Sequence, residues 1–241
     1  MSRNLPAQMA DRLIVALDVP NVAQARDIAT KLDGVVSFFK IGMWLLYAPG
    51  TEKLIDDFIA SGKRVFLDAK MHDISETVRA GAASAAARGV RFMTIHGEPQ
   101  VIEAAMAGKG NSALQILAVT VLTSLTDTDL QTMGYRKTVP ELVAQRVAGV
   151  IALGGDGVIA SAQDDPNAIR AQAKAPELLI VTPGIRPPGA DAGDQKRIAT
   201  PAAAIAKGAD YLVVGRPIIA ALDPCAAAQA IIADMELGAA A

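Results

Sequence analysis

Short apolar runs rich in β-branched residues alternate along this chain with alanine-rich stretches of helical periodicity. The apolar runs predict eight strands, at residues 13–19, 38–42, 64–70, 92–97, 114–121, 157–160, 178–183 and 211–215. Each predicted strand is followed by a stretch that is able to form a helix. Such alternation is typical of a parallel sheet, and eight units in 241 residues favour a closed barrel over an open sheet. We therefore predict an α/β fold, a (β/α)8 TIM barrel, as a single catalytic domain over residues 1–241.

Signals at helix ends support this division of the chain. Asp73, Ser75 and Glu76 precede an alanine-rich run, as expected of a capped helix start. Pro140 precedes another apolar-periodic stretch and suits the first turn of a helix. The interval between the fifth and sixth strands is longer than the others. We expect residues 123–134 to add a loop or a short helix there.

Charged residues stand at the ends of the first three predicted strands. In a barrel of this kind the active site lies at the carboxyl ends of the strands. The charged residues at these ends are Asp18, Lys40, Asp68 and Lys70. A single Asp–Lys pair at a strand end is often only solvated, but charges that end three successive strands favour a functional array.

The third strand places a carboxylate and an ammonium on one face. Side chains two residues apart on a strand point the same way, so Phe66, Asp68 and Lys70 share a side. If that side faces the barrel interior, both charges are partly buried and need partners. Asp18 and Lys40, on the neighbouring strands, are the expected partners.

The last third of the chain indicates a phosphate site. Gly184 and Arg186 follow the seventh strand, and Gly215 and Arg216 follow the eighth. Loops after these two strands commonly bind phosphate in barrels, and arginine gives bidentate contacts to the anion. Plain turns remain the alternative reading of the glycines. The loop at residues 185–197 is a candidate lid over the site.

Composition excludes several classes of protein. A net charge of −2 lacks the basic excess of nucleic-acid binders. The longest apolar stretch, residues 114–122, is shorter than the ~20 residues of a membrane span. One cysteine and two histidines make a structural zinc site an unfavourable reading. With no signal-peptide pattern at residues 1–12, we expect a cytoplasmic protein that binds neither membrane nor nucleic acid.

The segment FLDAKMHDISETV resembles the D-x-K-x-x-D signature of orotidine 5′-phosphate decarboxylases, here Asp68, Lys70 and Asp73. LIVALDVP, FFKIG, VTVLTS, VTPGIRP and VVGRPI resemble other strands of that family, so the resemblance spans nearly the whole chain. The signature alone is shared with hexulose-phosphate synthases and ketogulonate-phosphate decarboxylases, which use magnesium and a sugar phosphate. Their pattern is not seen in the fourth and fifth strands.

The resemblance implies decarboxylation of orotidine 5′-phosphate to UMP in de novo pyrimidine biosynthesis, with no cofactor and no metal. Lys70 would be the proton donor, and Asp68 would lie near the departing carboxylate. Lys40 and Asp73 would complete the charge array. Asp73 would come from the partner subunit of a homodimer that shares its active sites.

The resemblance also implies how the nucleotide substrate is held. Asp18 and Lys40 would bind ribose hydroxyls, and Thr77 would reach the neighbouring site. Contacts to the pyrimidine are expected from Thr123 and Ser124. The remaining substrate-binding residues, chiefly at the phosphate end, would be Pro183, Arg186, Gln195, Gly215 and Arg216.

Two histidines are left outside the predicted chemistry. We interpret His96 as a structural histidine and assign no role to His72, although it lies within the signature. Two other functions stay open on the sequence: a magnesium-dependent sugar-phosphate aldolase or decarboxylase, and a barrel protein that binds a phosphate ligand without turning it over.

Overall fold

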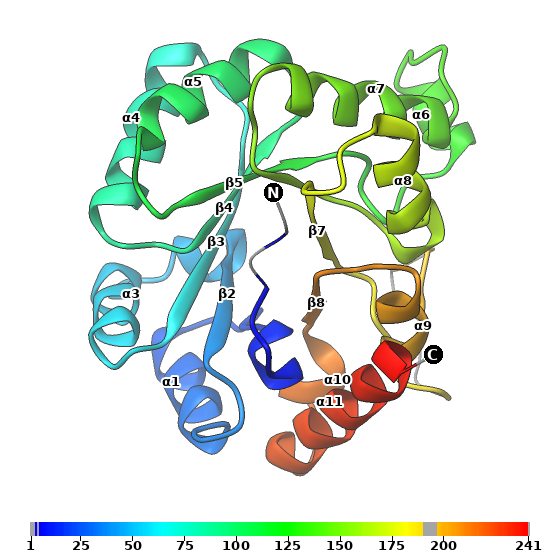
Figure 1. Cartoon of the computed structure of the whole chain (residues 1–241). Coiled ribbons are helices and arrows are strands. Elements are labelled where there is room, and N and C mark those ends of the chain that lie inside the picture. Colours follow the sequence, from blue (N-terminus) through cyan, green and yellow to red (C-terminus); the bar gives the residue numbers. More distant parts are fainter. Residues whose placement is uncertain (1–2, 4, 190–196, 241) are drawn as a thin grey trace.

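A computed structural model describes residues 3, 5–189 and 197–240 of the chain. Its strands form one closed parallel barrel in the order β1 to β8, with β8 paired to β1 (Figure 1). This confirms the predicted fold. The strands are β1 (Leu13–Ala16), β2 (Phe38–Gly42), β3 (Arg64–Met71), β4 (Phe92–His96), β5 (Gln115–Val119), β6 (Gly157–Ile159), β7 (Leu179–Thr182) and β8 (Tyr211–Val214).

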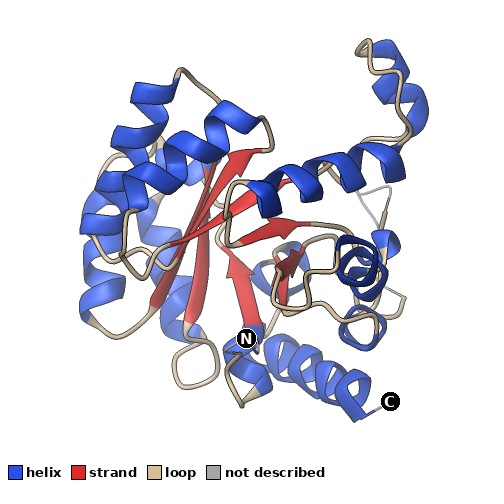
Figure 2. Cartoon of the chain, turned by 45° about the horizontal axis from the view of Figure 1, so that its top comes forward, coloured by secondary structure: helices blue, strands red, loops and turns tan. Residues whose placement is uncertain are grey.

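Helices surround the barrel on its outer side (Figure 2). The α-helices are α1 (Val22–Lys31), α2 (Met43–Leu46), α3 (Thr51–Ala60), α4 (Ser75–Ala87), α5 (Pro99–Lys109), α6 (Asp127–Thr132), α7 (Val139–Ala152), α8 (Pro166–Ala173), α9 (Pro201–Ala206), α10 (Arg216–Ile219) and α11 (Pro224–Ala240). Two 3-10 helices are η1 (Met9–Arg12) and η2 (Ala162–Asp164). Among the described residues, none of these helices combines the length and apolarity needed to cross a bilayer.

The predicted helix signals are largely confirmed. The extra segment after β5 contains α6, and Pro140 lies in the first turn of α7. Helix α4 begins at Ser75, but its N-cap is Ile74, which offers no capping side chain. Instead, Asp73 accepts a hydrogen bond from the Ile74 amide at 2.7 Å. The helix start was therefore readable from the sequence, whereas the way it is capped was not.

A layer of aromatic rings fills the barrel near the amino ends of the strands. Phe38 and Phe92 pack with their rings tilted by 54° at a centroid distance of 5.0 Å, and Phe92 and Tyr211 meet edge to face at 5.1 Å. Phe66 packs against the same group. Because strand side chains alternate between faces, the residues two further along point into the barrel one layer higher. That layer holds Lys40, Asp68 and Thr94, so the ring layer is the floor beneath the polar residues.

A buried ion pair also holds the amino end of the barrel together. Arg170 of α8 pairs with Asp210, which precedes β8, and both side chains are almost fully buried. Asp210 also accepts a hydrogen bond from the Ile180 amide at 2.8 Å, and it pairs with Arg3 at 2.8 Å. Burial raises the pKa of Asp210 even though Arg170 opposes this shift. The carboxylate therefore joins α8, β7, β8 and the N-terminal segment.

We predict that Asp210→Ala lowers the free energy of unfolding by about 3–5 kcal/mol, because it leaves the Arg170 guanidinium buried without its partner. Chemical denaturation followed by circular dichroism measures this loss. Asp27→Ala, which removes an ion pair to Lys31 with both side chains more than half exposed, is the control and should leave the denaturation midpoint unchanged. Equal effects of the two substitutions would contradict the prediction.

Candidate active site

A pocket of about 470 Å³ opens at the carboxyl ends of the strands. Its lower wall is apolar and includes Phe66, Val119 and Ile159. Most of the residues expected at a site line it. They are Asp18, Lys40, Asp68, Lys70, Thr123, Ser124, Pro183, Arg186, Gly215 and Arg216.

Four of these side chains form a row of alternating charge. Lys40 Nζ lies 2.9 Å from Asp18 Oδ1 and 3.2 Å from Asp68 Oδ2. Lys70 Nζ lies 2.8 Å from the same Asp68 Oδ2. The Asp68 carboxylate is thus shared between two ammonium groups, as the strand-end pattern indicated.

The buried charges of this row stabilise one another. Burial by itself lowers the pKa of the Lys40 ammonium, but the charges of Asp68 and Asp18 outweigh burial and raise that pKa above its ordinary value. Burial also disfavours the Asp68 carboxylate, yet Lys40 and Lys70 hold its pKa below the usual range. Both groups are therefore charged at neutral pH, although each alone would be costly to bury.

Gly42 makes room for the Lys40 ammonium. A Cβ atom on Gly42 would stand 2.9 Å from Lys40 Nζ and 3.0 Å from Asp18 Oδ1. Such contacts are closer than carbon atoms tolerate, so any side chain at this position would displace the pair. The glycine of the FFKIG segment thus permits the dense packing of charge beside it.

Lys70 occupies an unusual backbone conformation. Its φ angle is +43°, in the left-handed region that residues with a Cβ seldom adopt. The Lys70 side chain is about one-third exposed, and its ammonium reaches into the pocket. Strain of this kind at one residue of a buried array is typical of functional sites.

Two arginines line the pocket from the segments that follow β7 and β8. Arg186 follows β7 and is largely buried, with Nη1 donating to the Ile185 carbonyl at 2.9 Å. Arg216 begins α10, directly after Gly215. Gly184, between β7 and Arg186, has φ +76°, a conformation that suits glycine. The pocket therefore combines the charge row at the ends of β1, β2 and β3 with two arginines that follow β7 and β8.

Three of the predicted site residues are not among those that line the pocket. Asp73 and Thr77 lie on an exposed stretch of the loop after β3 and the start of α4. Gln195 lies outside the described residues. The prediction that Asp73 and Thr77 act in a neighbouring subunit remains a prediction.

Sequence-based prediction missed several polar residues of the site region, among them Ser161, which lines the pocket, Thr94 and Arg197. Thr94 of β4 is buried and hydrogen-bonded to Asp68, and its place two residues after the inward Phe92 was the available signal. Arg197 pairs with Asp164 and donates to the Val121 carbonyl at 3.0 Å. It thereby joins the chain after β7 to the segments after β5 and β6, which no local pattern indicates.

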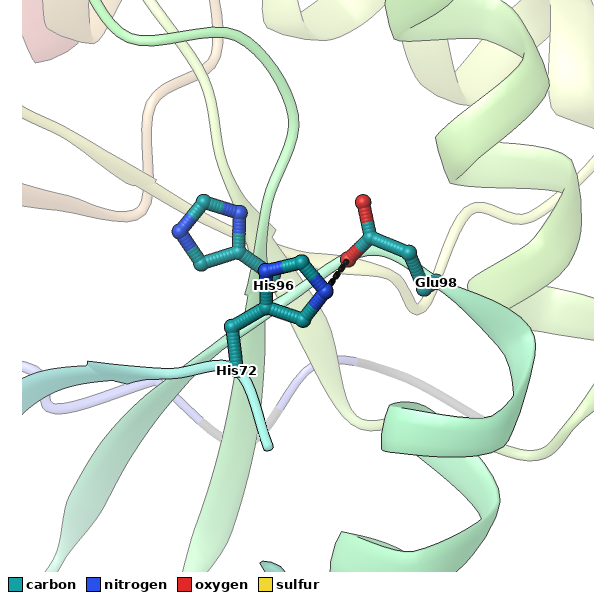
Figure 3. A group of neighbouring side chains, drawn as sticks. All are labelled: His72, His96 and Glu98. Atoms are coloured by element: carbon teal, nitrogen blue, oxygen red, sulfur yellow. Dashed lines mark ion pairs between the residues drawn. The ribbon is translucent and has the colours of Figure 1, made fainter. Parts of the chain in front are cut away.

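One group of side chains has the composition of a metal site. His72, His96 and Glu98 place ligand atoms within 4.8 Å of one another, and Figure 3 shows the His72 ring directed toward Glu98. The two imidazoles stack at 5.0 Å with planes 23° apart, so their in-plane lone pairs do not converge on one point. Glu98 already pairs with Arg146 at 3.0 Å. Burial, with His72, Arg146 and Lys70, lowers the pKa of His96 despite Glu98. We interpret the group as a structural contact.

Comparison with known proteins agrees with this geometry. Residues 11–231 match the model of the orotidine 5′-phosphate decarboxylase / HUMPS family. The chain belongs to this family. It is 52% identical over 230 residues to an orotidine 5′-phosphate decarboxylase of Afipia carboxidovorans, covering 95% of this chain and 97% of that protein. A protein of the same name from Cereibacter sphaeroides is 51% identical, with 93% and 97% covered.

A solved structure gives the same result for the fold. The crystal structure of orotidine 5′-phosphate decarboxylase from Lactobacillus acidophilus superimposes with a TM-score of 0.81 at 37% sequence identity. The match covers 93% of this chain and 99% of that one. The barrel described above is therefore the fold of a decarboxylase within this family.

We predict a pH-dependent contribution of Asp68 to stability. Its folded-state pKa is lowered, so the carboxylate stabilises the fold above its unfolded pKa of about 3.9, and this contribution is lost as the pH falls through the folded value. The difference in unfolding free energy between wild type and Asp68→Asn should therefore rise with pH below about 4 and stay level above it. Urea denaturation from pH 2.5 to 7 measures it. A difference that is constant or falls with pH would refute the assignment.

Proposed function

We propose that this chain catalyses the decarboxylation of orotidine 5′-phosphate to UMP, with no cofactor and no metal, in de novo pyrimidine biosynthesis. The observation that carries the proposal is the row Asp18–Lys40–Asp68–Lys70 inside a pocket that Arg186 and Arg216 also line. A nucleotide with a carboxylate at one end and a phosphate at the other matches this distribution of charge. The decarboxylases that are about half identical over nearly the whole chain support the same reaction.

The chemistry requires a positive charge at the carbon that loses CO2. When the bond between C6 and the carboxylate breaks, its electron pair stays on C6, and the pyrimidine ring delocalises this charge poorly. An ammonium fixed beside C6 stabilises the charge electrostatically and then transfers a proton to it. Lys70 is suited to this role, because Asp68 holds its Nζ at 2.8 Å and keeps its charge balanced. Neutral Lys70 then regains a proton from water.

The other charged residues of the row position the substrate and the proton donor. We assign Asp68 to the side of the departing carboxylate, where it also holds the ammonium groups of Lys40 and Lys70. Asp18 and Lys40, which lie 2.9 Å apart, are assigned to ribose hydroxyls. The pairing leaves one carboxylate next to the leaving group and one next to the sugar.

The remaining lining residues are assigned to the two ends of the nucleotide. Thr123 and Ser124 line the pocket and are assigned to the pyrimidine, and Pro183 and Gly215, which also line it, are assigned to the phosphate end. Arg186 and Arg216 supply the charge that a phosphate dianion needs. Gln195 is assigned to the same end on the family resemblance. Binding energy from the remote phosphate can then favour the transition state at C6.

We further propose a homodimer with shared active sites in the cytoplasm. Asp73 and Thr77 sit on an exposed stretch beside Ile74, whose side chain is 72% exposed in the single chain. An exposed apolar residue flanked by residues of the family signature fits a surface that meets a second copy. In such a dimer Asp73 would complete the charge row of the partner's site, and Thr77 would reach the same site.

The direct test is the ultraviolet absorbance of orotidine 5′-phosphate mixed with purified protein, with and without excess EDTA. Loss of the orotate band in both samples is expected. Loss only without EDTA would favour a magnesium-dependent sugar-phosphate enzyme of the same family, and binding without any loss would favour a non-catalytic nucleotide-binding barrel.

Lys70→Ala should abolish turnover yet still bind UMP in calorimetry, because the phosphate end is untouched. Residual turnover within tenfold of wild type would remove Lys70 as the proton donor.

Mixed dimers test the shared site. Lys70→Ala and Asp73→Ala are each expected to be nearly inactive alone. After unfolding and refolding as an equal mixture, heterodimers carry one site with both native residues, so activity should return to about a quarter of the wild-type value. An equal mixture of Lys70→Ala and Asp68→Ala is the control. The same chain supplies Asp68 and Lys70 to a given site, so every site in this mixture lacks one of the two residues and the mixture should stay inactive. Recovery in neither mixture would refute the contribution of Asp73 from the partner.

A further inference from the structure

The hydroxyl group of Thr94 joins the two residues on which the proposed chemistry depends. Thr94 is 1% exposed and lies on β4, beside the charged end of β3. Its Oγ1 donates to Asp68 Oδ1 at 2.8 Å and accepts from the Lys70 amide at 3.0 Å. A threonine hydroxyl has one hydrogen to donate and lone pairs to accept with, so one oxygen satisfies both partners.

The bond to the Lys70 amide replaces a bond of the β-ladder. Leu67 pairs with Met93 and Met71 with Ile95, so β3 advances four residues while β4 advances two. The intervening part of β3 bulges out of register, and its amides lose their regular partners on β4. Lys70 lies in this bulge with φ +43°. The Thr94 hydroxyl receives the Lys70 amide where the backbone of β4 does not.

The hydrogen bond from Thr94 gives the two oxygens of the Asp68 carboxylate different partners. Thr94 holds Oδ1, whereas Oδ2 faces Lys70 at 2.8 Å and Lys40 at 3.2 Å. A carboxylate held at one oxygen cannot rotate freely about its last bond. Thr94 therefore fixes the direction from which Asp68 holds the two ammonium groups.

We propose that Thr94 is a positioning residue for the decarboxylation, which sets the Lys70 ammonium at the reacting carbon by tying the bulged Lys70 backbone to the Asp68 carboxylate. The proposal rests on the role of Lys70 as proton donor put forward above. A threonine suits the position because its β-branched side chain has few rotamers, so the hydroxyl is held where both bonds form. Its effect falls on the chemical step, since Thr94 is not among the residues that line the pocket.

Thr94→Val and Thr94→Ser separate the hydroxyl from the shape of the side chain. Valine keeps the size and branching but removes the hydroxyl, and serine keeps the hydroxyl. We expect Thr94→Val to lower kcat at least tenfold, which corresponds to about 1.4 kcal/mol in the barrier, with KM within threefold of wild type. Thr94→Ser should keep kcat within threefold. A rise in KM without a fall in kcat would overturn the proposal.

Thr182 offers a matched control on β7. Its side chain is fully buried, and within the described part of the chain its Oγ1 has no hydrogen-bond partner. Thr182→Val therefore makes the same change in the barrel wall without breaking such a link, and should leave kcat unchanged. A fall in kcat equal to that of Thr94→Val would assign the effect to general loosening of the barrel. If Thr94→Val does not fold, as judged by circular dichroism and UMP binding, Thr94→Ala takes its place with the same expected kcat.

A double-mutant cycle identifies the route of the effect. In an Asp68→Ala background, which has no side-chain oxygen to accept from the hydroxyl, Thr94→Val should lower the free energy of unfolding far less than in wild type. Full additivity would refute an action through Asp68. The wild-type assay keeps the two levels apart: no turnover by wild type would defeat the proposed function itself. Turnover by wild type and equally by Thr94→Val would defeat the role of Thr94 alone.

Discussion

The sharing of one buried carboxylate between two ammonium groups is the constraint on which the rest of the site depends. Lys40 and Lys70 keep the buried Asp68 carboxylate charged, and Asp68 together with Asp18 keeps the buried Lys40 ammonium charged. The arrangement requires three neighbouring strands to end at one level with their charges inward. Gly42 favours it, since a side chain at that position would force the Lys40 ammonium to shift.

Regular strands position most side chains of this site, and one irregular segment positions Lys70. Strands β1 and β2 are regular where they meet their neighbours, and β4 is regular where it meets β5, so they deliver side chains at heights fixed by the alternation of faces. The exception is the bulge in β3, which carries Lys70, the residue proposed to donate the proton. A rigid frame with one local departure gives a side chain an orientation that no regular strand offers, and the frame supplies the free energy that the departure costs.

The barrel and most of the site could be predicted from local patterns. Periods of apolar residues marked the eight strands, and strand ends marked Asp18, Lys40, Asp68 and Lys70, because both signals are carried by residues close in sequence. The bulge could not be predicted, since it exists only in the pairing of β3 with β4. The same holds for the hydrogen bonds of Thr94 and for the Arg170–Asp210 pair, whose members lie forty positions apart. The ends of β1 and β5 were predicted too long because apolar residues continue past the last ladder bonds.

The ring layer near the amino ends of the strands determines how substrate enters the barrel and how products leave it. Among the residues that the structure describes, the rings of Phe38, Phe66, Phe92 and Tyr211 pack together below the charged row and close the barrel toward its far side. Whatever enters at the carboxyl face must leave by the same mouth. A small product released at the bottom, such as carbon dioxide, would have to pass the nucleotide lying above it or wait for its departure. The pocket is therefore closed at its inner end, and the molecule that lies nearest the opening leaves first.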